Sequence, residues 1–327
     1  MSRASLVRSC RRSGPLALVA PLFALLAVLL LGCQPMLEQV GVALFYVPAT
    51  LPEGQTQLDL AYRSDPGADP EKHRLDLFLP DPSRRDWPTL VFVHGGGWTH
   101  GDRAVEAAGA SVMRNIGRHF ASRGVGAAVI SYRLQPAVDW HDQLADVTAA
   151  LRFVREQVPA HGGHPDAIYL SGHSAGAWLA ARAGFDAGLL EASGVPQASL
   201  CGVVLVSGGG YDLADERTYA LGASRDYFVA RFDDGAEDWE RRGSVVPLLR
   251  PDLPPALILY GTAEPRKLTR QSELLFDAMQ ASGARVSRIV LPRQTHQSIV
   301  MTLSRGDATS VPAILDLMRR TDCPAGP

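Results

Sequence analysis

Short apolar runs separated by amphipathic stretches make up most of this chain. Apolar runs of strand length occupy residues 89–93, 125–131, 167–171, 200–206, 256–260 and 286–291. Between them, residues 142–158 place their apolar side chains at helical spacing, which predicts an amphipathic helix. Further helices are expected at residues 114–123, 175–183, 272–282 and 312–320. Strands that alternate with helices predict an α/β fold, with a mostly parallel central sheet and helices on both of its faces.

The segment before the first buried run has a different pattern. Residues 58–62 and 74–79 alternate apolar and polar positions, and Pro66, Gly67 and Pro70 lie between them. This alternation predicts a half-buried hairpin ahead of the parallel strands.

A serine stands at the junction of one predicted strand and the helix after it. Residues 172–176 read Gly-His-Ser-Ala-Gly and connect the run at 167–171 to the helical stretch at 175–183. A nucleophile elbow holds its serine in a strained turn, and the two flanking glycines leave room where strand and helix crowd together. The short motif alone is weak, but its position between a buried strand and a helix favours Ser174 as a nucleophile.

A glycine-rich turn follows the run at 89–93. Residues 94–98 read His-Gly-Gly-Gly-Trp, and glycines without a Cβ can aim backbone N–H groups at a developing oxyanion. A glycine-rich turn followed later by a serine elbow is the order of the α/β-hydrolase fold. Because both motifs occur in that order, we interpret the turn as chemical and not merely as a tight connection.

The base and the acid follow from chain order, which in this fold runs serine, then Asp or Glu, then histidine. His296 is the one histidine after the elbow, and a short polar loop separates it from the run at 286–291. Glu264 lies just beyond the run at 256–260, where catalytic groups of parallel sheets gather. It would orient the imidazole, although a carboxylate at a helix start is the alternative role. Asp212 is the alternative acid.

Residues 211–251 break the alternation of strands and helices. They are polar and charged, and their aromatic residues include Tyr219, Tyr227, Phe228, Phe232 and Trp239. One interpretation is a cap insertion over the serine. The other is a helical excursion whose aromatic side chains pack inward, and both stay open at this stage.

The first 32 residues predict a secretory signal. Four arginines and no acidic residue precede an apolar stretch at 16–31, which a small residue ends. Residues 30–33 read Leu-Leu-Gly-Cys and resemble the bacterial lipoprotein signal, which implies a lipid-modified Cys33; an uncleaved signal anchor is the alternative. By resemblance to the bacterial sorting rule, Gln34 favours the outer membrane. We expect a signal at 1–32, a spacer at 33–54 and a hydrolase domain at 55–327.

Composition limits the partners of that domain. Removal of residues 1–32 would shift the formal net charge from −2 to −6, and an acidic body argues against nucleic acid. The sequence contains neither a C-x-x-C nor an H-E-x-x-H motif, so we expect no metal and no cofactor. Cys201 and Cys323 could pair in an oxidising compartment, but Cys201 opens a buried run, which favours a free buried cysteine.

The motifs together resemble those of a known group of enzymes. The glycine turn at 94–98 with Gly101-Asp102, the Ser-Tyr-Arg-Leu at 131–134 and the elbow resemble α/β-hydrolase esterases of the hormone-sensitive-lipase and feruloyl-esterase-like group. Kynurenine formamidases and prenylcysteine methylesterases are also similar, over residues 75–300. The resemblance implies that Ser174 is acylated, that His296 transfers the proton, and that the N–H groups of three residues form the oxyanion hole: Gly96, Gly97 and Ala175.

Three positions depart from the family pattern. Residues 162–165 read Gly-Gly-His-Pro, so His164 replaces the Asp of the usual Gly-Gly-Asp-Pro. Glu264 stands where formamidases usually have Asp. Residues 294–297 lack the glycine that many esterases have beside the base. The leading hypothesis is a serine hydrolase that cleaves a small-molecule carboxylic ester through an acyl-enzyme. The alternatives are formamide or amide hydrolysis, deacetylation of a glycan or envelope ester, and a binding protein with a dead site. We expect a location on the periplasmic side of the cell envelope.

Overall fold

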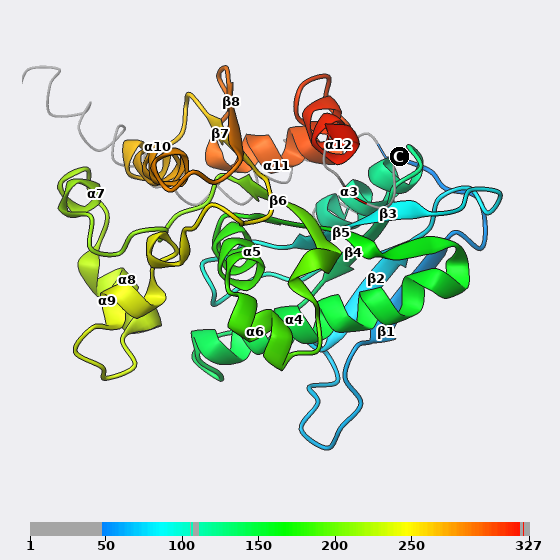
Figure 1. Ribbon diagram of the computed structural model, residues 1–327, viewed down its shortest axis with the longest axis horizontal. Coiled ribbons are helices and arrows are strands. Elements are labelled where there is room, and N and C mark those ends of the chain that lie inside the picture. The colour runs from blue at the N-terminus through cyan, green and yellow to red at the C-terminus, as the bar shows by residue number, and fades with distance from the viewer. Residues whose placement is uncertain (1–47, 105, 107–110, 321–322, 324–327) are drawn as a thin grey trace, which may run out of the picture. The chain divides into compact units, whose positions relative to one another are not determined.

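The computed structural model describes residues 48–104, 106, 111–320 and 323 (Figure 1). The signal predicted at 1–32, the lipid attachment predicted at Cys33 and most of the spacer lie outside the described residues. Within the described ranges, no helix combines the length and the apolar character that crossing a bilayer requires.

The described strands form one eight-stranded sheet in the order β1-β2-β4-β3-β5-β6-β7-β8. The first two strands form the predicted hairpin, and β2 also pairs antiparallel with β4, whereas every other neighbouring pair is parallel. The bounds are β1 Thr56–Ala61, β2 Arg74–Phe78, β3 Trp87–Val93, β4 Gly126–Ile130, β5 Gly163–His173, β6 Leu200–Val206, β7 Ala256–Gly261 and β8 Val286–Leu291. The mostly parallel sheet predicted from the sequence is confirmed.

Helices cover both faces of the sheet, and the alternation of side chains along the strands supplies a core to each. On β3, Leu90 and Phe92 pack toward one layer, while Val91 and Val93 pack toward the other. The first layer contains α3 (Val112–Ala121), α11 (His296–Ser304) and α12 (Ser310–Arg320). The second contains α4 (Trp140–Gln157), α5 (Ala175–Phe185), α6 (Ala187–Ala192) and α10 (Arg266–Ala281), and Figure 1 shows α4, α5 and α6 opposite α11 and α12. Short 3₁₀ turns occupy η1 Val158–His161 and η2 Gln197–Ser199.

The segment between β6 and β7 folds into three short helices and a 3₁₀ turn. They are α7 (Glu216–Ala220), α8 (Arg225–Phe232), α9 (Trp239–Gly243) and η3 (Val246–Leu248). The sequence left two interpretations of this segment, a cap over the serine and an excursion whose aromatic side chains pack inward, and its aromatic residues differ in burial. Phe232 is fully buried against Trp98 and Trp178, with ring centroids 5.0 and 4.8 Å away. Tyr227 keeps 38% of its surface exposed.

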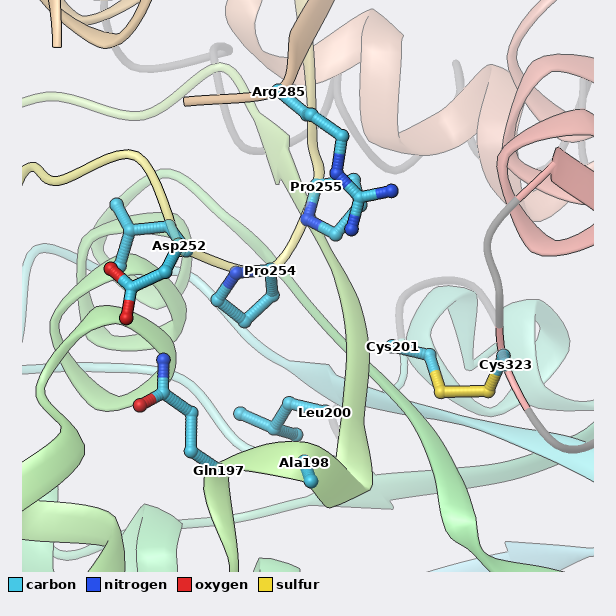
Figure 2. A pocket seen from close by; sticks show the side chains of 10 residues that line it. Gln197, Ala198, Leu200, Cys201, Asp252, Pro254, Pro255, Arg285 and Cys323 are labelled. Carbon is cyan, nitrogen blue, oxygen red and sulfur yellow. A yellow bond between two sulfur atoms is a disulfide. The ribbon is translucent and has the colours of Figure 1, made fainter. Parts of the chain in front are cut away.

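Cys201 and Cys323 form a disulfide, so the free cysteine favoured by the sequence pattern is wrong (Figure 2). Cys201 is buried near the start of β6, and the Cα of Cys323 lies 5.7 Å from the Cα of Cys201. A cavity of about 340 Å³ lies beside the disulfide. The local pattern does not distinguish the two cases, because both a free and a disulfide-bonded cysteine can occupy the start of a buried strand. The pairing depends on where α12 ends.

Candidate active site

Ser174 occupies the sharp connection between β5 and α5. Its backbone has φ 56° and ψ −120°, a sparsely populated positive-φ conformation that is strained for a residue with a side chain. The flanking glycines make this turn possible: a Cβ on Gly172 would collide with the carbonyl of Gly176, and a Cβ on Gly176 would collide with the carbonyl of Val93. The serine side chain is thereby presented at the carboxyl end of β5.

His296 approaches the serine from the other side of the site. Its Nε2 lies 2.9 Å from Ser174 Oγ. The residue is the first of α11 and not a loop residue as the sequence suggested, because Thr295 caps this helix in a reciprocal capping box with Ser298. Serine replaces the usual Glu or Gln of that motif, so the helix start was not evident. The capped start fixes the backbone that carries the imidazole.

Glu264 follows β7 and lies behind the imidazole, with a side chain that has no exposed surface. Its Oε1 accepts a hydrogen bond from the Gly261 N–H at 2.6 Å and a short one from the Ser207 hydroxyl. Its Oε2 lies 3.6 Å from His296 Nδ1, and neither of these two buried atoms hydrogen-bonds any other described group. The carboxyl group is therefore held by one oxygen and directs the other at the imidazole.

Asp212 does not take this position. Its carboxylate accepts from the Ala214 N–H at 3.0 Å, and its own N–H donates to Gln271. No ion pair joins it to His296 in the described part of the chain. Of the two acids considered from the sequence, the structure brings Glu264 to the histidine.

The glycine turn borders a cavity of about 370 Å³ together with Ser174 and His296. Gly96 and Gly97 have φ of 123° and 60°, and a Cβ on Gly96 would collide with the carbonyl of His100. Among the described residues, the N–H groups of Gly96, Gly97 and Ala175 find no backbone acceptor in the loops around the site. Unpaired donors beside a cavity and a serine hydroxyl can receive a negatively charged oxygen.

Two buried histidines support the site without contacting Ser174 Oγ. Burial lowers the pKa of His94 to about 4, and its Nδ1 donates to the Gly95 carbonyl at 2.7 Å, which braces the turn. Burial, and then the charge of His296, lower the pKa of His173 to about 3. Its Nε2 donates to the main-chain carbonyl of His296 at 2.9 Å. No pattern in the sequence indicated this bond or the position of Ser207 behind the acid.

No metal centre accompanies this arrangement in the described ranges. No group of three or more His, Cys, Asp or Glu side chains there could hold a metal ion.

Known proteins resemble this chain in sequence. Residues 75–279, more than half of the chain, match the family model described as BD-FAE. A probable isoprenylcysteine alpha-carbonyl methylesterase ICMEL1 of Oryza sativa subsp. japonica is 29% identical over 70% of this chain and 55% of its own length. Esterase LipQ of Mycobacterium tuberculosis is 31% identical over 68% of this chain and 53% of its own. The chain thus spans about half the length of the curated relatives it matches.

Solved structures agree on the architecture. Esterase B from Lactobacillus rhamnosis superposes with a TM-score of 0.67 over 90% of this chain and 94% of that protein, at 24% identity. At this identity the likeness shows the fold alone, and it confirms the α/β-hydrolase architecture expected from the sequence. With the family match, the resemblance inferred from the motifs is confirmed, and the chain belongs to the BD-FAE family of α/β-hydrolase esterases.

Proposed function

We propose that this protein hydrolyses a carboxylic ester through an acyl-enzyme intermediate, with Ser174 as nucleophile. The observation that carries the proposal is the 2.9 Å contact between Ser174 Oγ and His296 Nε2, made beside a cavity bordered by the glycine turn. A serine hydroxyl is a weak nucleophile until an adjacent base accepts its proton.

In the first half of the reaction, Ser174 Oγ attacks the ester carbonyl while His296 Nε2 takes the hydroxyl proton. The carbonyl oxygen becomes negatively charged and accepts hydrogen bonds from the N–H groups of Gly96, Gly97 and Ala175. The imidazolium then gives its proton to the departing alcohol, which leaves an acyl-serine. In the second half, water replaces the alcohol, and the same base and the same donors release the acid.

Glu264 acts in this proposal by orientation and by charge. Its Oε2 would accept a hydrogen bond from the Nδ1–H group of His296. This bond keeps Nε2 free to accept the serine proton, and the carboxylate charge stabilises the imidazolium. The hydrogen bonds from Gly261 and Ser207 to the other oxygen support this role, because they prevent rotation of the carboxyl group.

The names of the two relatives, a methylesterase and an esterase, favour esters over formamides and amides. The same catalytic atoms would serve formamide or glycan-ester hydrolysis. A panel of p-nitrophenyl esters of increasing acyl length, run beside N-formylkynurenine and an acetylated sugar, separates these substrates. We expect turnover of the p-nitrophenyl esters alone, or turnover of these esters that is at least about tenfold faster than that of N-formylkynurenine and the acetylated sugar.

The substitution Ser174→Ala tests the nucleophile. We expect kcat to fall by about 10⁴- to 10⁶-fold, as removal of a triad serine does elsewhere. Ser171→Ala, in β5 just before the elbow, is the matched control, because its buried hydroxyl has no hydrogen-bond partner among the described residues and its removal breaks none. A Ser174→Ala enzyme that keeps most of its activity would rule out the proposed nucleophile.

We also propose that the protein is a lipoprotein tethered through Cys33 to the periplasmic side of the cell envelope, in the outer membrane. The proposal rests on the Leu-Leu-Gly-Cys sequence at 30–33 and on Gln34 after it. Two or more acyl chains hold a protein stably on a membrane, whereas one does so marginally. Mass spectrometry of the mature N-terminus should therefore find an acylated Cys33. Cys33→Ser should abolish that modification, Cys10→Ser should not, and an unmodified N-terminus elsewhere would contradict the proposal.

A further inference from the structure

A side chain from the segment between β6 and β7 binds the glycine turn. Arg231 lies near the end of α8, and its Nε donates to the carbonyl oxygen of Gly97 at 3.0 Å. Gly97 is one of the residues that line the cavity. The two residues are 134 positions apart in the chain, so this contact joins the segment between β6 and β7 directly to the turn.

Contacts other than the one to the glycine turn also hold Arg231 in place. Its guanidinium carbon lies 3.5 Å from the centre of the Tyr227 ring, and its Nη1 donates to the Tyr227 carbonyl at 2.9 Å. Gln135 donates to the Arg231 carbonyl at 3.0 Å. Next along the helix, Phe232 packs its ring against Trp98, which directly follows Gly97. A guanidinium held in this way reaches the turn with few alternative positions.

The turn needs such a contact because its own backbone is unusual. Gly97 and Trp98 have φ of 60° and 66°, which places two consecutive residues in the left-handed region. Glycine has the greatest conformational freedom of any residue, and a left-handed tryptophan persists only when neighbouring contacts impose it. The Trp98 carbonyl is bound by the Gln135 N–H and by Gln143 Nε2. The Gly97 carbonyl, which precedes it, is bound by Arg231 with a charge-assisted hydrogen bond.

We propose that Arg231 is a positioning residue for the oxyanion hole: by binding the Gly97 carbonyl it keeps the N–H groups of the turn aimed at the cavity. This inference rests on the ester hydrolysis proposed above, and it assigns the segment between β6 and β7 a part in forming the reactive site. Donors misplaced by about 1 Å lose a large share of transition-state stabilisation, while the ground-state ester, which carries less charge, is affected less. The expected defect therefore lies in kcat and not in KM.

Arg231→Gln and Arg231→Lys test the proposal, with Arg225→Gln as the matched control. Arg225 also belongs to α8 and also stacks on a tyrosine, 4.4 Å from the centre of the Tyr219 ring, but its partners are Glu216 and Glu240. Kinetics use the full-length protein with p-nitrophenyl butyrate, beside melting temperatures for every variant. We expect Arg231→Gln to lower kcat by about 10- to 100-fold, with KM changed less than about threefold. Arg231→Lys should restore part of kcat, since it keeps a charged donor, and Arg225→Gln should stay within about twofold of wild type.

The outcomes separate cleanly. A kcat for Arg231→Gln equal to that of Arg225→Gln overturns the inference, and so does a rise in KM without a fall in kcat, which would make the arginine a contact for substrate. If Arg231→Gln does not fold, Arg231→Lys decides the question, because a kcat equal to wild type refutes the need for the guanidinium. A wild-type protein that neither turns over the ester nor reacts with a fluorophosphonate would instead refute the proposed hydrolase function itself.

Discussion

Glu264→Gln is the substitution whose effect follows most directly from the geometry around the acid. Glutamine has the shape of glutamate but carries one acceptor and one donor in place of two acceptors. The Gly261 N–H, 2.6 Å from Oε1, can only donate, so the glutamine oxygen must occupy that position. The amide nitrogen is then forced into the position of Oε2, opposite His296 Nδ1.

The consequence is a wrong tautomer of the histidine. An N–H donor opposite Nδ1 requires that Nδ1 accept, which places the imidazole proton on Nε2, facing Ser174 Oγ. A protonated Nε2 cannot accept the serine proton, so the base is lost while the packing is preserved. The same kind of defect in other serine hydrolases lowers kcat by about 10²- to 10⁴-fold, which corresponds to about 2.7 to 5.5 kcal/mol of transition-state stabilisation.

Steady-state kinetics with a p-nitrophenyl ester, together with a melting curve, measure the effect. The melting temperature should stay within a few degrees of wild type, because the Gly261 hydrogen bond survives. Asp212→Asn is the control, since its carboxylate accepts from Ala214 and makes no described contact with the histidine. If Asp212→Asn lowers kcat more than Glu264→Gln does, the assignment of the acid is refuted.

Two further predictions concern stability. The pKa of His173, lowered from 6.5 to about 3, means that the unfolded chain binds more protons than the folded one in that interval, so stability falls as pH falls. When the pH is lowered from 7 to 5, the free energy of unfolding of the wild type should fall by about 2 kcal/mol more than that of His173→Gln, as measured in urea titrations. An equal fall in both proteins would contradict the burial effect. The disulfide joins residues 122 positions apart, so Cys323→Ser should cost about 2 to 5 kcal/mol under non-reducing conditions. Its kcat should be unchanged, because Cys201 lies at the amino end of β6, and a matching loss of activity would argue otherwise.

The sequence predicts those parts of the fold and site that depend on local patterns. Buried strands read as apolar runs because both faces of a parallel strand are covered. The elbow and the glycine turn could be recognised because the backbone there excludes side chains, so glycine itself marks the geometry. The proximity of Glu264 to His296 could be expected because both follow parallel strands at the same edge of the sheet.

Other features depend on contacts between distant segments. The disulfide requires that Cys323 lie beside the start of β6, and neither cysteine's neighbours in sequence encode that proximity. Ser207 supports the acid only because β6 and β7 lie side by side. Arg231 is one of several arginines in a charged segment, and no local pattern distinguishes it from Arg225. His296 opens a helix with a serine-based capping box, which the usual glutamate signature would not reveal.

The central claim is that Ser174 is the nucleophile of this site, and a covalent probe tests it most directly. A serine activated by His296 should displace fluoride from a fluorophosphonate and gain one phosphonyl group, measured by intact mass and then by peptide mapping. We predict a single adduct on the peptide that contains Ser174, absent from Ser174→Ala and present in Ser171→Ala. The absence of an adduct from folded wild-type protein, or an adduct of equal extent in Ser174→Ala, would contradict the claim.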